Sequence, residues 1–217
     1  MTFASPSRPD RRGFVAAALS LAVSGPAFAA PAGARRVVTI LGDSITAGYG
    51  LRAADALPAQ LQSSLVRLGT PATVRGAGVS GDTTAGGLAR VDFSVQPDTT
   101  VAVVALGGND LLQGLNPRAM QSNLSRIVER LKARRMRVVL CGLHAPSSLN
   151  AGYAREFNAV FPAVARAQGV AFYPDLLAGV ELNQRLNQKD GIHPNPQGVR
   201  IIASRLAPVL ARALGPA

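Results

Sequence analysis

V-V-T-I-L-G-D-S-I-T-A-G-Y-G, residues 37–50, is the most informative stretch of this 217-residue sequence. Its β-branched and apolar beginning predicts a buried strand, which breaks abruptly at Gly42-Asp43-Ser44 into small and polar residues. In α/β sheets, ligands bind in the crevice outside the carboxyl ends of the strands. The Ser44 hydroxyl would therefore stand where such folds bind their ligands, which makes Ser44 the first candidate nucleophile.

The sequence on the C-terminal side of this stretch alternates between helix and strand patterns. It predicts further strands at residues 72–75, 99–106, 137–141 and 170–173, and helices at residues 57–68, 84–91, 117–135, 153–168 and 197–214. The run at residues 99–106 is almost continuously apolar, which is typical of a strand buried on both faces of a parallel sheet. The alternation predicts one three-layer α/β domain over residues 30–217, with a five-stranded parallel sheet between helical layers.

Residues 1–29 have the pattern of a secretory signal. Three arginines precede an apolar run at residues 14–23, and Ala27-Phe28-Ala29 forms an A-x-A cleavage site. The run is far shorter than the roughly 20 residues that span a bilayer, which favours a signal over a membrane anchor. Arg11-Arg12 also resembles a twin-arginine export signal, although Asp10 replaces the usual Ser or Thr before the pair. We expect a bacterial protein that is periplasmic or secreted after residues 1–29 are removed.

The mature chain is basic and has a single cysteine. The formal net charge of +11 falls to +9 without residues 1–29, which carry three arginines and one aspartate. Aromatic residues make up only 5%, and Lys and Arg are scattered apart from a cluster at residues 132–137, so we expect a solvated helix face and no nucleic-acid partner. The charge remains compatible with an anionic lipid. Cys141 lies in an apolar run, which predicts a buried structural thiol.

Three further segments concentrate small and polar residues: G-A-G-V-S-G-D at 76–82, G-G-N-D at 107–110 and D-G-I-H-P-N at 190–195. Hydrolysis of an acyl bond through serine needs a base, a group that orients the base, and donors for the developing oxyanion. Thr46 stands where the G-x-S-x-G elbow of α/β-hydrolases requires glycine. The partners of Ser44 must therefore come from these other segments.

The base is one of two histidines, His144 and His193. Asp190 precedes His193 by three residues, so its carboxylate can hold the Nδ1 proton and leave Nε2 free for Ser44. His144 has no such neighbour and is interpreted as a wall of the crevice or a loop residue. His193 is therefore the predicted base and Asp190 its orienting group.

Candidate oxyanion donors are the backbone N–H groups of Ser44 and Gly78 and the side-chain amide of Asn109. Glycine allows a substrate to approach the backbone closely, and an amide donates without charge. Glycine and asparagine are also common turn residues, so this alternative stays open. We interpret the carboxylates Asp43 and Asp110 as structural, the first as a turn residue beside Ser44 and the second as a helix-start cap.

Together, G-D-S-I at 42–45, Gly78, G-G-N-D at 107–110 and D-x-x-H at 190–193 resemble the sequence blocks of the GDSL, or SGNH, hydrolases, with Ile45 in place of leucine. The longer stretches at 42–51 and 80–84 are most similar to the bacterial multifunctional acyl-CoA thioesterase, lysophospholipase and arylesterase group. The resemblance implies a flavodoxin-like fold without metal or cofactor. It also implies a nucleophile at Ser44, its partners Asp190 and His193, and oxyanion donors at Gly78 and Asn109.

The function implied by the resemblance is that of a serine esterase with an acyl-enzyme at Ser44. Its substrates would be small aryl esters, acyl thioesters or lysophospholipids, and His144 would lie near a substrate-binding loop. A carbohydrate O-acetyl esterase of the same superfamily is one alternative. Alternatives from other classes are an inactive scaffold and a flavodoxin-like module that binds phosphate or flavin at residues 42–50. The Asp190 and His193 pair argues against the binding module, because phosphate binding does not require it.

Overall fold

The computed structural model describes residues 1–3, 36–146 and 148–215, so the predicted signal lies almost wholly outside the described residues. The strands are β1 (Val37–Gly42), β2 (Thr73–Gly78), β3 (Val101–Ala105), β4 (Arg137–Cys141) and β5 (Ala171–Tyr173). The helices are α1 (Ser44–Ala47), η1 (Ala53–Asp55), α2 (Leu57–Arg67), α3 (Thr84–Ser94), α4 (Gly108–Leu112), α5 (Pro117–Ala133), α6 (Ala151–Gln168) and α7 (Pro196–Leu214).

The five strands form one sheet in the order β2-β1-β3-β4-β5, and each neighbouring pair is parallel. All residues of β1 and β3 are buried, as expected for central strands covered on both faces. Gly42 at the end of β1 lies opposite Gly78 of β2 and Ala105 of β3. The loops after these three strands therefore leave the sheet at the same level.

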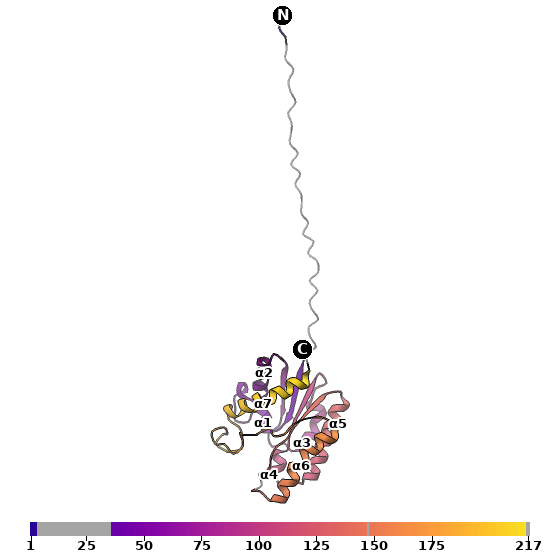
Figure 1. The fold of residues 1–217 in the computed structure, drawn as a ribbon, viewed down its shortest axis with the longest axis vertical. Helices are drawn as coiled ribbons and strands as arrows, with labels where there is room; N and C mark the ends of the chain where they lie inside the picture. Colours follow the sequence, from indigo (N-terminus) through magenta and orange to yellow (C-terminus); the bar gives the residue numbers. More distant parts are fainter. Residues whose placement is uncertain (4–35, 147, 216–217) are drawn as a thin grey trace. The chain divides into compact units, whose positions relative to one another are not determined.

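Two apolar clusters hold the helices on the sheet. Helices α2 and α7 cover one face with residues such as Leu61 and Leu206, and helices α3, α5 and α6 cover the other with residues such as Ile127 and Phe157 (Figure 1). Burying one large apolar side chain contributes about 1.5–3 kcal/mol. The predicted three-layer α/β fold with a five-stranded parallel sheet is confirmed.

The elements differ from the prediction near the carboxyl ends of the strands. Strand β2 continues through the glycines to Gly78, because backbone pairing with β1 does not depend on side chains. Helices α1 and α4 were not predicted, since four or five residues are too few to show a helical period. Helix α1 begins shortly after β1 and helix α4 shortly after β3, and they carry Ser44 and Asn109 respectively.

Residues 174–195, between β5 and α7, contain turns and one isolated antiparallel bridge that joins Asn187 to Pro194. The buried Asn187 side chain donates a hydrogen bond to the Val180 carbonyl (2.7 Å). The Gln188 amide donates to the Tyr49 carbonyl (2.8 Å). The Gln188 bond joins this segment to the residues that follow α1, while Leu176, Val180 and Leu186 bury their side chains in the apolar cluster beneath α7.

Cys141 is buried in β4, and burial raises the pKa of its thiol to about 12. The predicted structural role of this thiol is confirmed.

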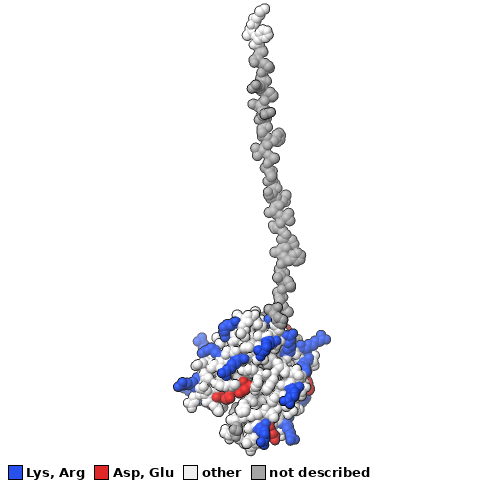
Figure 2. Space-filling view, viewed as in Figure 1, with Lys and Arg blue, Asp and Glu red and all other residues white. Residues whose placement is uncertain are grey.

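Lys and Arg side chains are spread over the face seen in Figure 2 rather than gathered in one patch. No helix in the described part of the chain has both the length and the apolar character needed to cross a membrane.

Candidate active site

Ser44, Asp190 and His193 come together beyond the carboxyl end of β1. The Nε2 atom of His193 lies 2.8 Å from the Ser44 Oγ atom, and its Nδ1 atom lies 2.7 Å from Oδ2 of Asp190. With Nδ1 protonated, the imidazole donates to the Asp190 carboxylate and accepts the Ser44 hydroxyl proton. The structure thus unites three residues that lie up to 149 positions apart in the sequence.

A tight turn between β1 and α1 positions Ser44. The Ile45 N–H donates to Oδ1 of Asp43 (3.1 Å), which caps α1 as predicted for a turn residue. A Cβ atom at Gly42 would lie 2.1 Å from Oγ1 of Thr46, so only glycine fits before the turn. Ser44 is the first residue of α1, where a backbone N–H has no acceptor within the helix.

Asp43 places a second carboxyl group beside the imidazole. Its burial raises the pKa of the carboxyl group to about 6, against the lowering effects of its backbone hydrogen bonds and the nearby His193.

Asp190 and His193 form a compact turn. Oδ1 of Asp190 accepts hydrogen bonds from the N–H groups of Ile192 and His193, both at 3.0 Å. These bonds, led by that of the His193 backbone, and the bond to the His193 ring lower the pKa of Asp190 to about 2. The Tyr49 ring packs on the imidazole with centroids 4.6 Å apart. Tyr49 is not among the predicted site residues, and its only signal in the sequence is its place in residues 42–51.

A cavity of about 350 Å³ opens beside Ser44 and His193. Its apolar wall includes Leu111, Leu112, Leu143, Leu176, Leu177 and Ile192. His144 also lines it, together with the carboxylate residues Asp175 and Glu181, and none of its described lining residues is Lys or Arg. Burial, followed by the charge of Asp175, raises the pKa of Glu181. In the described part of the chain, no three His, Cys, Asp or Glu residues are close enough to hold a metal ion.

The structure corrects the position of one expected oxyanion donor. Gly78 is the last residue of β2 and lines a separate depression beside α1 and α2, not the cavity. A Cβ atom at Gly78 would lie 2.3 Å from the Ala47 nitrogen. The lack of a side chain at this position therefore allows α1 to pack closely on β2. Gly81, three residues later, lines the cavity with Ser44 and Asn109. The S-G-D-T-T stretch at 80–84 contained the signal for it.

Gly78→Ala is expected to lower the free energy of unfolding by about 3 kcal/mol, because overpacking against the α1 backbone forces β2 or α1 to shift. Gly81→Ala is the matched comparison. No atom lies within 4 Å of the Cβ position of Gly81, whose φ is +81°, so backbone strain should lower its stability by only about 1–2 kcal/mol. Urea unfolding of both variants measures the difference. Equal stability of Gly78→Ala and the parent would contradict the packing role.

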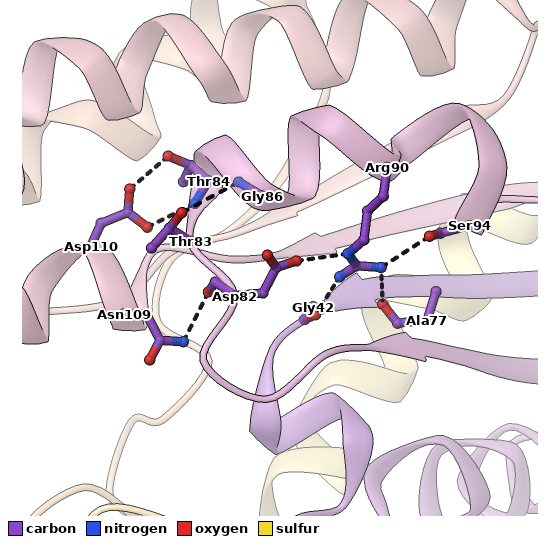
Figure 3. A network of polar contacts seen from close by, with 10 residues as sticks. All are labelled: Gly42, Ala77, Asp82, Thr83, Thr84, Gly86, Arg90, Ser94, Asn109 and Asp110. Atoms are coloured by element: carbon purple, nitrogen blue, oxygen red, sulfur yellow. Dashed lines mark hydrogen bonds and ion pairs between the residues drawn. The ribbon is translucent and has the colours of Figure 1, made fainter.

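Asn109 and Asp110 lie in the first turn of α4 (Figure 3). The Nδ2 atom of Asn109 donates to the Asp82 carbonyl (2.8 Å), which leaves the second amide N–H for another acceptor. Asp110 was predicted to be a helix-start cap, and its carboxylate accepts from the N–H (2.8 Å) and the hydroxyl (2.6 Å) of Thr84, at the start of α3 rather than of α4. The cap acts between helices, which sequence spacing cannot show.

A family model, that of the GDSL-like lipase/acylhydrolase family, matches residues 40–201 and thus spans Ser44 to His193. The chain belongs to this family. This GDSL-family protein is therefore an ester-hydrolysing enzyme, as the sequence resemblance implied. Membership sets aside the flavin-binding and scaffold alternatives.

Individual relatives agree with this assignment. Esterase TesA of Pseudomonas aeruginosa is 37% identical over 162 residues, which cover 74% of this chain and 81% of TesA. Thioesterase 1/protease 1/lysophospholipase L1 of Escherichia coli is 34% identical over 177 residues, or 81% of this chain and 84% of the relative. The crystal structure of AlinE4, an SGNH-hydrolase family esterase, superimposes with a TM-score of 0.70 at 42% identity and covers 85% of this chain and 99% of AlinE4.

Proposed function

We propose that this GDSL-family enzyme is an exported serine esterase that forms an acyl-enzyme at Ser44. The observation that carries the proposal is the continuous hydrogen-bonded chain from Asp190 through His193 to Ser44, with contacts of 2.7 and 2.8 Å. His193 removes the hydroxyl proton as Ser44 attacks the acyl carbonyl carbon, and Asp190 stabilises the resulting imidazolium.

The attack places a negative charge on the carbonyl oxygen. The proposed donors to this oxyanion are the N–H groups of Ser44 and Gly81 and the free amide N–H of Asn109, all from residues that border the cavity. His193 then gives its proton to the leaving alcohol or thiol, which departs and leaves the acyl group on Ser44. A water molecule, deprotonated by His193, attacks this ester, and His193 returns the proton to the Ser44 oxygen as the acid is released.

The lining of the cavity favours neutral acyl groups longer than acetyl. A volume of about 350 Å³ walled by leucines offers far more apolar contact than a two-carbon group can use. This feature favours aryl esters, acyl thioesters and lysophospholipids over the O-acetyl groups of carbohydrates. Export rests on the signal pattern of residues 1–29 and implies a periplasmic or secreted enzyme.

Hydrolysis of p-nitrophenyl butyrate by residues 30–217 tests the proposal, with a folded Ser44→Ala variant beside the parent. Turnover by the parent that disappears in the variant supports the serine mechanism. Equal turnover by both contradicts it, and so does a folded parent that hydrolyses neither this ester nor longer acyl esters.

The carboxylates of the cavity predict a charge preference. We expect kcat/KM for mono-p-nitrophenyl glutarate, which ends in a carboxylate, to be at least about 10-fold below that for p-nitrophenyl butyrate, because about 1.4 kcal/mol of repulsion gives this factor. Glu181→Gln should bring the kcat/KM values for the two esters closer together. Glu156→Gln, a change at an exposed residue of α6, should leave the difference between them unchanged. A parent enzyme that hydrolyses both esters equally well would contradict this prediction.

A further inference from the structure

Arg90 of α3 lies at the centre of a polar network beside the active site (Figure 3). Its Nε atom donates to Oδ2 of Asp82 (2.7 Å), and 19% of the arginine side chain and 11% of the aspartate side chain are exposed. Its Nη2 atom donates to the Gly42 carbonyl (2.8 Å). Its Nη1 atom donates to the Ala77 carbonyl (2.9 Å) and to the Ser94 hydroxyl (3.1 Å).

Two of these acceptors lie at the ends of neighbouring strands. Gly42 ends β1 two residues before Ser44, and Ala77 is the penultimate residue of β2. The Gly42 carbonyl also accepts the Val79 N–H (3.1 Å). One guanidinium group therefore joins the two strand ends from which the Ser44 turn and the Gly81 turn begin.

Another acceptor of Arg90, Asp82, connects it to Asn109. Asp82 closes a turn by donating its N–H to the Val79 carbonyl (3.1 Å), with Gly81 inside the turn. Its carboxylate binds Arg90, while its carbonyl accepts the Asn109 amide (2.8 Å). Each proposed oxyanion donor therefore lies next to a group that Arg90 binds. Ser44 is two residues from Gly42, Gly81 is adjacent to Asp82, and Asn109 binds the Asp82 carbonyl.

We propose that Arg90 is a positioning residue that sets the geometry of the oxyanion donors Ser44, Gly81 and Asn109. This inference rests on the proposed function. Arg90 is absent from the described lining of the cavity, so it acts on turnover through these donors and not through contact with substrate. Lysine cannot replace it, because a single ammonium group cannot donate along the diverging directions of the planar guanidinium.

The test compares Arg90→Lys with Arg130→Lys. Arg130 contacts the same helix through the Leu88 carbonyl and Asp92, away from the 79–82 turn, so it is a matched control. We expect Arg90→Lys to lower kcat for p-nitrophenyl butyrate by about 10- to 100-fold, the range for displaced reacting groups, with little change in KM. Rates are expressed per active site titrated with a phosphonate, so loss of folded protein does not count as loss of turnover. An unchanged kcat for Arg90→Lys would overturn the inference.

A double-mutant cycle with Asn109→Ala separates positioning from general stability. If Arg90 acts through the oxyanion donors, Arg90→Lys has a smaller effect in the Asn109→Ala background than in the parent. If Arg90→Lys lowers kcat by the same factor in the parent and in the Asn109→Ala background, the inference is overturned. If Arg90→Lys does not fold, Asp82→Asn replaces it in the test, because it removes the charge of the carboxylate that Arg90 binds. It should also lower kcat with little change in KM. An active Ser44→Ala enzyme would instead refute the proposed function itself.

Discussion

Ser44→Ala is expected to lower kcat for p-nitrophenyl butyrate by about 10⁴-fold or more, the scale seen when a catalytic nucleophile is removed. The alanine variant retains the cavity and the other oxyanion donors, but it has no oxygen within reach of His193. Without that oxygen no acyl-enzyme forms, and only slow attack by water remains.

Ser63→Ala is the matched control for this change. Ser63 is an exposed serine of α2 whose hydroxyl donates only to the Ala59 carbonyl of its own helix (3.0 Å). We expect it to keep the turnover of the parent. Intact-mass measurement after reaction with a phosphonate adds a second readout, since the parent should gain one adduct and Ser44→Ala none. An adduct on Ser44→Ala would locate the nucleophile elsewhere.

Asp190→Asn is expected to lower kcat by about 10⁴-fold while the fold stays intact. An asparagine amide can donate to Nδ1 of His193 and thereby place the ring proton on Nε2, where it blocks acceptance of the Ser44 proton. Asp55→Asn, at a surface aspartate 3.8 Å from Arg200, is the control and should stay active. Comparable activity of the two variants would rule out the orienting role of Asp190.

Asp190→Asn is also expected to change how the free energy of unfolding depends on pH. The fold lowers the pKa of Asp190 from 3.8 to about 2, so the ionised carboxylate stabilises the folded state. This contribution is fully present above the unfolded pKa and is lost as the pH falls toward 2. Urea midpoints at pH 6 and near pH 2 should therefore show a stability gap between parent and Asp190→Asn that narrows in acid. A gap that widens in acid would contradict the assigned hydrogen bonds.

The sequence predicted those features whose signals are local. The apolar runs gave the strands of the sheet, and the three-residue spacing of Asp190 and His193 gave their contact, because both residues lie in one turn. The pairing with Ser44 followed from the need of a nucleophilic serine for a base, and from the neighbour Asp190, which His144 lacks. The structure places these three residues within hydrogen-bonding distance, as that reasoning expected.

Features that depend on the packing of distant segments could not be predicted. Gly78 and Gly81 look alike in the sequence, and only the contact of α1 with β2 shows that the first is a packing residue. Asp110 caps α3 across 26 positions, which no spacing rule would suggest. Arg90 is one of many arginines in the sequence, and its role becomes visible only when the strand ends surround its guanidinium.

The segment at residues 174–195 divides the active site into parts of unequal local stability. Ser44 follows the fully buried strand β1, whereas Asp190 and His193 belong to a turn outside the sheet whose residues 189–192 are exposed. Segments of this kind open at lower free energy than the sheet they cover. Warming would thus disconnect the base from the nucleophile while the sheet and its helices persist. Heat inactivation of this enzyme would then precede its denaturation and reverse on cooling, without passage through the unfolded chain.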